Sequence, residues 1–425
     1  MTSSDFQPLP GMSDLGVPEI STWQRMEEKA RQVLALYGFT EVRTPVLEPT
    51  SVFVRSLGDT TDVVQKEMYT FEDRGGRSVS LRPEGTASII RYAAGLGQEA
   101  ADGRFYYMGP MFRCERPQAG RKRQFHQFGV EALGVASPAA DVEVIALQQH
   151  VFSAWGLKAS GVELNTRGLP EDRRAVVEGL TQALKPHMGE LCEDCRRRYE
   201  SNILRVLDCK QEACGKVVDA LPPMTSFMSD ASRKYIDDVL RLLEQLSIPA
   251  RINPRLVRGL DYYVHTVWEN RHPALGAQDA ISGGGRYQIE VAGKLIDGVG
   301  FAVGMERVVT ALQHDMGGAL EGAPGPVVWI VSQGDRALAE NMVLAQTLRL
   351  RGVACGIDVH ARSLKSQMRQ ANRAGSAYAV IRGDLELEKG LLVLKNMKDG
   401  SQAEMSLAEL VERLHAVGGT EVLKS

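Results

Sequence analysis

The segment FRCERPQAGRKRQFHQFGVE, residues 112–131, concentrates side chains that could bind a nucleotide or a phosphate. Because side chains alternate along a strand, Arg113 and Glu115 fall on one side of an extended segment. After a basic, glycine-bearing loop, Gln127 and Glu131 share one face of a second expected strand. This hairpin favours a nucleotide or phosphate site, although the same spacing also fits a solvated hairpin with its charges in water.

A second candidate segment is LVRGLDYYVHTVWE, residues 256–269. Arg258 precedes a glycine, and Tyr262 and Tyr263 follow an acidic residue. A guanidinium is permanently charged and suits bidentate binding of phosphate. The alternative is a structural arginine–aspartate pair beside tyrosines of the core.

Two further segments bring glycines close to charged residues. In DGVGFAVGMERV, residues 297–308, the glycine spacing is not that of a dinucleotide-binding loop, and no acid follows at the distance a ribose requires. We expect a glycine-rich strand that leads into a helix carrying Arg307, so that a ligand can approach the backbone. LRPEGT places Glu84 and Thr86 in a turn after a strand, where buried oxygens could hold an ammonium group.

A cluster of cysteines has the spacing C-x2-C-x13-C-x4-C and consists of Cys192, Cys195, Cys209 and Cys214. In a cytoplasmic protein this pattern suggests a structural, tetrahedral Zn²⁺ site. Four free thiols in a charged module are the alternative, since only the first pair has a tight metal-ligand spacing.

The composition is that of a globular protein, with 425 residues, 44% of them hydrophobic and 24% charged, and a net charge of −3. The length predicts two or three domains. We expect no membrane span and no signal peptide, and therefore a cytoplasmic location. The net charge argues against general coating of nucleic acid, but the basic segments 116–123 and 362–373 leave local RNA binding open.

The first half of the chain predicts one helix and then several short strands. Ser21 or Thr22 could cap the helix, and Gly38 would end it. The strands follow in close succession without a helix after each, which indicates an antiparallel sheet, at 40–44, 68–71, 78–81 and 105–108.

The pattern changes twice further along. Charges and cysteines are dense in 169–228, which we interpret as an inserted module between sheet segments at 1–168 and 229–320. After a linker, 326–425 alternates strand and helix and predicts a small α/β domain with a mostly parallel sheet. One basic stripe at helical spacing in this domain faces either RNA or solvent: Arg362, Lys365, Arg369 and Arg373.

Taken together, these segments resemble the histidyl-tRNA synthetase family of the class II aminoacyl-tRNA synthetases. Eight motifs occur in the family's order and cover nearly the whole chain: PLPGMSD, YGFTEVRTPVLE, GDTTDVVQKEMYTF, LRPEGT, FRCERPQAGRKRQFHQFGVE, LVRGLDYY, SGGGRY and GVGFAVGMERV. One departure is Gln288, which follows GGGRY where the family commonly has aspartate.

The resemblance implies an α+β fold, with an antiparallel catalytic sheet flanked by helices, a helical insert and a C-terminal α/β anticodon-binding domain at 326–425. It implies a homodimer whose interface involves the segment around Pro45. It also implies a reaction in which L-histidine and ATP, with Mg²⁺, give histidyl-adenylate and pyrophosphate. The histidyl group then passes to the 3′ end of tRNA(His).

The resemblance assigns roles to the candidate residues, with Arg113, Arg258 and Gln127 as the catalytic group. The ATP-binding residues are Arg113, Glu115 near the adenine, Arg258 at the α-phosphate and Arg307 at the polyphosphate. The histidine-binding residues are Glu84, Thr86, Gln127, Glu131, Tyr262 and Tyr263. The tRNA-binding residues are Arg116, Gln118, Arg121 and Arg123.

Two other functions compete with this interpretation. A non-catalytic paralogue acting as a regulatory subunit of histidine biosynthesis would be a binding protein, and such paralogues lose the ATP-site arginines and the C-terminal domain. A synthetase for another amino acid would share the fold. The retained arginines and residues 326–425 argue against the first, and LVRGLDYY with the pairing of Gln127 and Glu131 argues against the second.

Overall fold

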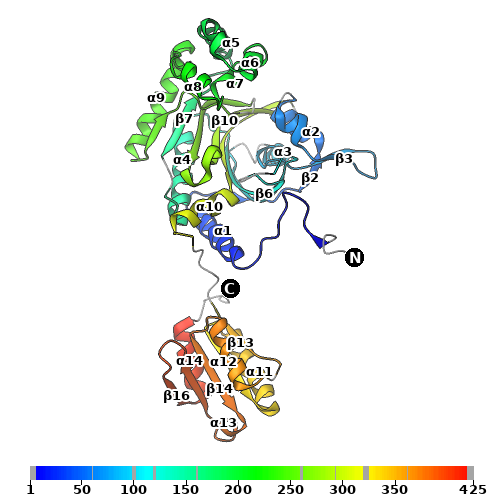
Figure 1. The fold of residues 1–425 in the computed structure, drawn as a ribbon, viewed down its shortest axis with the longest axis vertical. Helices are drawn as coiled ribbons and strands as arrows, with labels where there is room; N and C mark the ends of the chain where they lie inside the picture. The colour runs from blue at the N-terminus through cyan, green and yellow to red at the C-terminus, as the bar shows by residue number, and fades with distance from the viewer. Residues whose placement is uncertain are drawn as a thin grey trace. The chain divides into compact units, whose positions relative to one another are not determined.

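The computed structural model describes residues 6–59, 61–97, 102–117, 121–158, 161–258, 262–291, 293–318, 325–360 and 362–418. The chain divides into two compact units, Met1–Glu321 and Gly322–Ser425, and each contains its own sheet and hydrophobic core (Figure 1). Within the described residues, every helix is too short or too polar to cross a membrane.

The first unit is built on an eight-stranded sheet. Its strands lie in the order β1 (Thr40–Glu41), β5 (Arg104–Phe112), β6 (Gln124–Leu133), β11 (Lys294–Gly304), β10 (Ala280–Val291), β9 (Tyr263–Arg271), β7 (Val162–Thr166) and β8 (Ala250–Ile252). Strands β5 to β7 in this order pair antiparallel, and the two edge strands run parallel to their neighbours. The predicted antiparallel-rich sheet is therefore confirmed, although two of the predicted strands that it contains, at 40–44 and 105–108, pair parallel at its edge.

Helices on one face of this sheet form its main core. They are α1 (Glu19–Leu36), α4 (Pro138–Trp155), α9 (Asp230–Gln245) and α10 (Met305–Asp315). Alternate residues of β6 and β11, among them Phe128 and Phe301, point into this core. The intervening residues therefore face the other side of the sheet.

On that other side lie α2 (Thr50–Leu57), a π-helical turn at Val63–Glu67, α3 (Thr86–Leu96) and a small antiparallel sheet. The small sheet has the order β2 (Leu47–Pro49), β4 (Ser78–Leu81) and β3 (Thr70–Glu72). A short 3₁₀ segment at Pro273–Gln278 joins β9 to β10.

Helix α1 begins earlier than the sequence predicted. Its first residue is Glu19, and Ser21 and Thr22 are buried inside the helix, so the predicted caps are wrong. The Ser21 hydroxyl donates to the carbonyl of Pro18 at 2.7 Å instead of accepting an amide hydrogen. Gly38 follows the helix with φ +72°, in agreement with its predicted role at the end.

A helical insert follows β7 and has its own core, separate from that of the sheet (Figure 1). It comprises α5 (Asp172–Leu184), a 3₁₀ segment at Lys185–Glu190, α6 (Glu193–Ser201), α7 (Leu204–Leu207), α8 (Glu212–Asp219) and a 3₁₀ turn at Met224–Phe227. The fold thus contains the predicted helical insert. The boundaries of the insert at residues 169 and 228 remain a prediction.

The second unit has a five-stranded sheet in the order β13 (Cys355–Ile357), β12 (Val328–Gln333), β14 (Tyr378–Gly383), β15 (Leu392–Asn396) and β16 (Gln402–Met405). Its helices are α11 (Asp335–Leu350), α12 (Leu364–Arg373), α13 (Asp384–Glu388) and α14 (Leu407–Gly418). Strands β13, β12 and β14 are parallel, but β15 and β16 pair antiparallel. The expectation of a mostly parallel sheet was wrong, because a C-terminal hairpin extends the edge.

A buried ion pair joins the helical layer to the sheet. Arg286 of β10 is 1% exposed and Asp141 of α4 is fully buried, and the Nε–Oδ1 distance is 2.9 Å. Arg286 also binds Asp297 of β11 at 2.8 Å, and the Tyr235 hydroxyl of α9 donates to Asp141 at 3.1 Å. Burial raises the pKa of Asp141, and the guanidinium opposes this effect. The hydrogen bonds of Arg286 and Asp141 therefore connect two helices, α4 and α9, to two strands, β10 and β11.

Replacing Arg286 with methionine would leave the Asp141 carboxylate buried without its cation. We expect a loss of about 3–5 kcal/mol in the free energy of unfolding. Arg174→Met is the control, because Arg174 is 88% exposed and its pair with Glu178 should contribute at most about 1 kcal/mol. Urea denaturation followed by tryptophan fluorescence measures both, and equal losses would contradict the role of the buried pair.

Candidate active site

A cleft of about 590 Å³ lies over β6, β10 and β11, beside the start of α10. Four arginines line it: Arg113, Arg121, Arg258 and Arg307. Gln127 of β6 and the glycines Gly283 and Gly304 line it too. A concave site with several fixed cations is suited to a polyphosphate anion.

Arg113 follows the last residue of β5 and is held from two sides. Its Nε donates to the carbonyl of Pro83 at 2.9 Å, and its guanidinium carbon lies 5.3 Å from the centre of the Phe125 ring. Glu115 lies next to it, 3.9 Å from Arg113 and 3.0 Å from Arg121. The predicted neighbours Arg113 and Glu115 thus do meet in the cleft.

Arg307 lies in the first turn of α10, and its Nη1 donates to the carbonyl of Ala280 at 2.6 Å. Burial lowers the pKa of Arg307, and the positive charges of Arg121 and Arg113 lower it further. These three guanidinium groups therefore repel one another. An anion with several charges placed between them would relieve that repulsion.

Arg258 lies directly on the backbone of β10. A Cβ atom at Gly283 would be 2.3 Å from its Nη1, so only glycine leaves room for the guanidinium. Glu269 of β9 accepts from Arg258 at 2.7 Å. Within the described part of the chain, Arg258 Nε and Gln127 Oε1 are buried and make no hydrogen bond. Since buried polar atoms are normally paired, both are available to a ligand.

A buried carboxylate lies farther along the same face of β6. Glu131 is 1% exposed, and its two oxygens accept hydrogen bonds from the Thr86 and Tyr287 hydroxyls, each at 2.7 Å. A Cβ atom at Gly300 of β11 would be 2.1 Å from Glu131 Oε2, so a glycine again makes room. Burial raises the pKa of Glu131 to about 8, although both hydrogen bonds oppose the shift.

Glu84 has a structural role that the sequence did not reveal. Its carboxylate accepts the backbone amides of Thr86 at 2.9 Å and Ala87 at 2.8 Å, at the start of α3. Burial raises the pKa of Glu84, and these hydrogen bonds counteract it. Thr86 connects the two acids, because its amide donates to Glu84 and its hydroxyl to Glu131.

Tyrosines surround this carboxylate pair. The rings of Tyr262 and Tyr263 are 4.6 Å apart, and Tyr262 is 5.7 Å from Tyr287. Tyr263 lies over Gly285 of β10, where a Cβ atom would be 2.6 Å from the ring. The other predicted histidine-binding residues therefore lie together in one largely buried polar cluster, on the sheet face that also carries Gln127.

Two members of this pocket, Tyr107 and Tyr287, were not predicted as site residues. The Tyr107 ring occupies space that Cβ atoms at Gly85 and Gly129 would enter, at 2.1 and 2.2 Å. Tyr287 follows the glycines of SGGGRY. Because residues two apart in a strand share a face, the sequence could have placed Tyr287 on the same face as Gly285. For Tyr107 the signal was its position opposite Gly129 in the β5–β6 hairpin.

The predicted tRNA-binding residues that the structure describes differ in their exposure. Arg116 is exposed, whereas Arg121 lines the cleft and pairs with Glu115. Arg123 donates from Nε to the carbonyl of Glu115 at 3.2 Å and is partly buried. Gln118 lies outside the described residues. The four predicted cysteine ligands lie together in the helical insert.

The raised pKa of Glu131 predicts a dependence of stability on pH. Between its ordinary value of 4.5 and about 8, the folded chain keeps a proton that the unfolded chain releases. Stability should therefore fall as pH rises through this window, by up to about 1.4 kcal/mol per pH unit from this group. Glu131→Gln, which has no charge, should lack this part of the decline.

Urea denaturation of both proteins from about pH 5 to about pH 8 measures this difference. Glu178→Gln is the control, because that carboxylate is 58% exposed and its removal should leave the pH profile parallel to that of the unmodified chain. A Glu131→Gln profile parallel to that of the unmodified chain would be inconsistent with a carboxyl group that stays protonated.

Comparison with known proteins assigns this fold and site to a family. A family model described as histidyl-tRNA synthetase matches residues 11–308, and one described as anticodon binding domain matches 327–416. The chain is 45% identical over 414 residues to a histidine–tRNA ligase of Halothermothrix orenii, covering 95% of this chain and 97% of that protein. It is 43% identical over 409 residues to that of Desulfitobacterium hafniense, covering 95% and 96%.

A solved structure agrees with these sequence relatives. The apo histidyl-tRNA synthetase of Staphylococcus aureus superimposes with a TM-score of 0.79 at 33% identity, covering 96% of this chain and 99% of that one. The match extends through both units, so the likeness is not limited to a shared domain. The chain belongs to the histidyl-tRNA synthetase family.

Proposed function

We propose that this chain is a ligase that activates L-histidine with ATP and transfers it to tRNA(His). The main observation in support of this function is that two groups of residues with different chemistry lie on one face of the sheet. A cleft is lined by four arginines and by Gln127 of β6, and the same strand carries Glu131, which belongs to a buried cluster of two carboxyl groups and several tyrosines. The first suits the phosphates of ATP, and the second suits a small polar amino acid.

In the first step, a carboxylate oxygen of histidine attacks the α-phosphorus of ATP and the bond to pyrophosphate breaks. The barrier arises mainly from the repulsion of two anions and from their alignment. Arg113 and Arg258 would neutralise the α-phosphate, and Arg307 would hold the outgoing polyphosphate. Gln127 lines the same cleft, and its side-chain amide N–H would donate to the attacking carboxylate and position it.

In the second step, a hydroxyl at the 3′ end of the tRNA attacks the acyl carbon of histidyl-adenylate. The ester bond to the tRNA forms, and AMP leaves with the electron pair of the anhydride bond. Arg113 and Arg258 would again hold the phosphate, now that of the leaving AMP. Arg116 is exposed, four residues after the end of β5, and would meet the acceptor end of the tRNA.

The buried pocket would select histidine through both ring nitrogens. Glu131 can accept from one N–H, and the Tyr263 hydroxyl can donate to or accept from the other nitrogen. Apolar analogues would leave these buried groups without partners, which can give discrimination of about 10⁴-fold or more. Glu84 and Thr86 would hold the α-amino group, since a carboxylate accepts about four hydrogen bonds and Glu84 uses two within the chain.

Mg²⁺ would enter this reaction bound to the phosphates of ATP. The ion favours one or two carboxylates together with substrate phosphates. Glu115 supplies a carboxylate among the arginines of the cleft, which fits this donor set. The Glu115 carboxylate would therefore either coordinate Mg²⁺ or hydrogen-bond to the nucleotide and orient it.

The C-terminal unit would bind the anticodon region through α12. Lys365, Arg369 and Arg373 are exposed on this helix, and Gln367 and Ala371 form its buried side. Arg362 is also exposed but precedes the helix, so the predicted four-residue stripe is shorter within the helix itself. Exposed cations on one helix face suit contacts with phosphates.

We also propose that the chain acts as a homodimer in the cytoplasm, where translation takes place. Exposed apolar side chains beside Pro45 and on the small sheet support an interface there: Val46, Leu47 and Phe71 are 37, 41 and 49% exposed. The rival regulatory paralogue is disfavoured, because the cleft keeps its arginines and the chain includes the anticodon-binding domain.

The central test is histidine-dependent exchange of pyrophosphate into ATP. We expect exchange with histidine, and a fall of at least about 100-fold in Arg258→Ala, because a fixed charge on the reacting phosphate is lost. Arg174→Ala, an exposed arginine of the insert, is the control and should keep full exchange. Folded protein that shows no exchange with histidine would refute the function, and near-normal exchange by Arg258→Ala would refute its role.

Charge reversal on α12 should separate tRNA binding from activation. Lys365→Glu with Arg369→Glu should raise the KM for tRNA by roughly 10- to 100-fold, because two phosphate contacts become repulsive. Pyrophosphate exchange should stay unchanged. The matched control reverses two other exposed arginines of the same unit, Arg336 and Arg351. Equal effects of the two double variants on aminoacylation would contradict a specific role of α12.

A further inference from the structure

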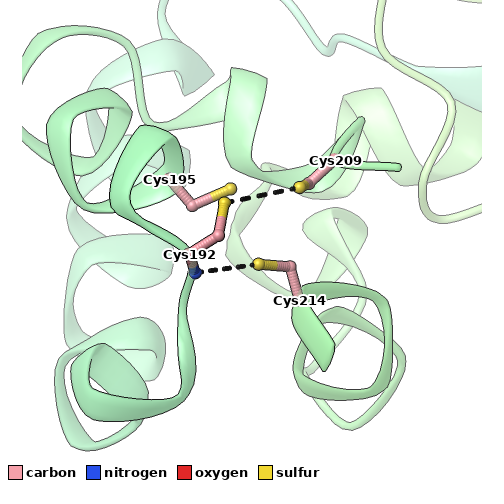
Figure 2. Close-up of side chains that lie close together, drawn as sticks. All are labelled: Cys192, Cys195, Cys209 and Cys214. Carbon is pink, nitrogen blue, oxygen red and sulfur yellow. Dashed lines mark hydrogen bonds between the residues drawn. The ribbon is translucent and has the colours of Figure 1, made fainter. Parts of the chain in front are cut away.

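The four cysteines of the helical insert point toward one another (Figure 2). Cys192 precedes α6, Cys195 lies in its first turn, Cys209 follows α7 and Cys214 lies in the first turn of α8. All four sulfur atoms are within 4.8 Å of one another. Three separate segments therefore supply one compact group of sulfurs.

We propose that this group binds one structural Zn²⁺ as a tetrathiolate. Sulfurs at about 2.3 Å from a tetrahedral zinc lie about 3.8 Å apart. The Sγ atoms of Cys192 and Cys209 are 3.9 Å apart, as this geometry requires. A disulfide needs a sulfur–sulfur distance of about 2.05 Å, so the same pair is not bonded. Four ligands complete the coordination, which is the pattern of a structural rather than a catalytic zinc.

The surroundings of the cluster offer helix N-termini and a backbone amide to the sulfur atoms. The first turns of α6 and α8 contribute cysteines, and the N-terminus of a helix stabilises negative charge. The backbone amide of Cys192 donates to Cys214 Sγ at 3.2 Å. Such amide–sulfur hydrogen bonds are typical of the outer shell that orients metal ligands.

A bound metal would stabilise the insert, because the hydrophobic core of the insert is small. Its apolar cluster is separate from the main core, and Cys195 and Cys214 are fully buried members of it. Helices of 9, 4 and 8 residues, α6 to α8, are too short to be stable by themselves. A metal that joins three segments would replace the missing hydrophobic stabilisation.

The metal would also support the segment that carries Arg258. Arg255 forms an ion pair with Asp219 of α8 and donates to the carbonyl of Gly215 at 2.8 Å. Val257 packs against the core of the insert. Because Cys214 lies on α8, a metal bound there would hold the helix on which Arg255 rests. The metal site is thus coupled to the backbone just before the cleft.

The first experiment measures metal in the full chain, purified without chelator. We expect about one zinc per chain by mass spectrometry, and replacement by Co²⁺ should give the intense charge-transfer and d–d bands of tetrahedral thiolate coordination. Cys209→Ser, at a half-buried ligand, should lose these bands or most of the zinc. Cys355→Ser, at a half-buried cysteine of the other unit, should keep both.

The second measurement concerns the coupling to Arg258. Removal of zinc should increase hydrogen exchange at residues 253–257, where Asn253 and Leu256 amides are hydrogen-bonded, and leave the C-terminal unit unchanged. Unchanged exchange after zinc removal would refute the coupling.

Three outcomes would overturn the zinc assignment: four freely titrating thiols with no stoichiometric metal, iron as the bound metal, or full zinc content in Cys209→Ser. The metal assignment does not rest on the ligase function. A chain that holds zinc and exchanges no pyrophosphate would refute the ligase alone.

Discussion

The site depends on the close packing of large side chains against glycines of the antiparallel sheet. Arg258 lies over Gly283, Tyr263 over Gly285, and Glu131 against Gly300. A Cβ atom at any of these glycines would come within 2.6 Å of the side chain above it. The glycines of β10 and β11 thus leave parts of this face without a side chain, and large functional groups from neighbouring strands and loops can lie there.

Basic and acidic groups lie at the two ends of this face. At one end the cleft brings together arginines whose mutual repulsion Glu115 relieves in part and a bound polyphosphate would relieve further. At the other, Glu131 and Glu84 are buried so deeply that their pKa values rise. On the opposite side of the sheet, Arg286 neutralises Asp141 and ties two helices to the strands. Rigid attachment matters because a preorganised site must keep its charges in place against repulsion.

Much of this arrangement was predictable from local patterns. Closely spaced strands indicated the antiparallel sheet, and alternation placed Gln127 and Glu131 on one face, as the β6 register confirms. Other features depend on distant contacts. Tyr107 fits between Gly85 and Gly129, which lie on different elements, and Glu84 caps α3 with its side chain. The hairpin β15–β16, whose strands pair antiparallel with β14 and with each other, was not predicted.

By itself, the sequence determined the family, the reaction and the candidate residues, because eight motifs occur in the order of one family and cover nearly the whole chain. Only the tertiary structure decided which of those side chains lie next to one another. It places Arg121 beside Glu115 in the cleft, and it brings the sulfur atoms of four cysteines spaced over 23 residues, 192–214, to within 4.8 Å of one another. The physical reason is that distances between side chains are set by packing across the sheet and between helices, which local spacing does not encode.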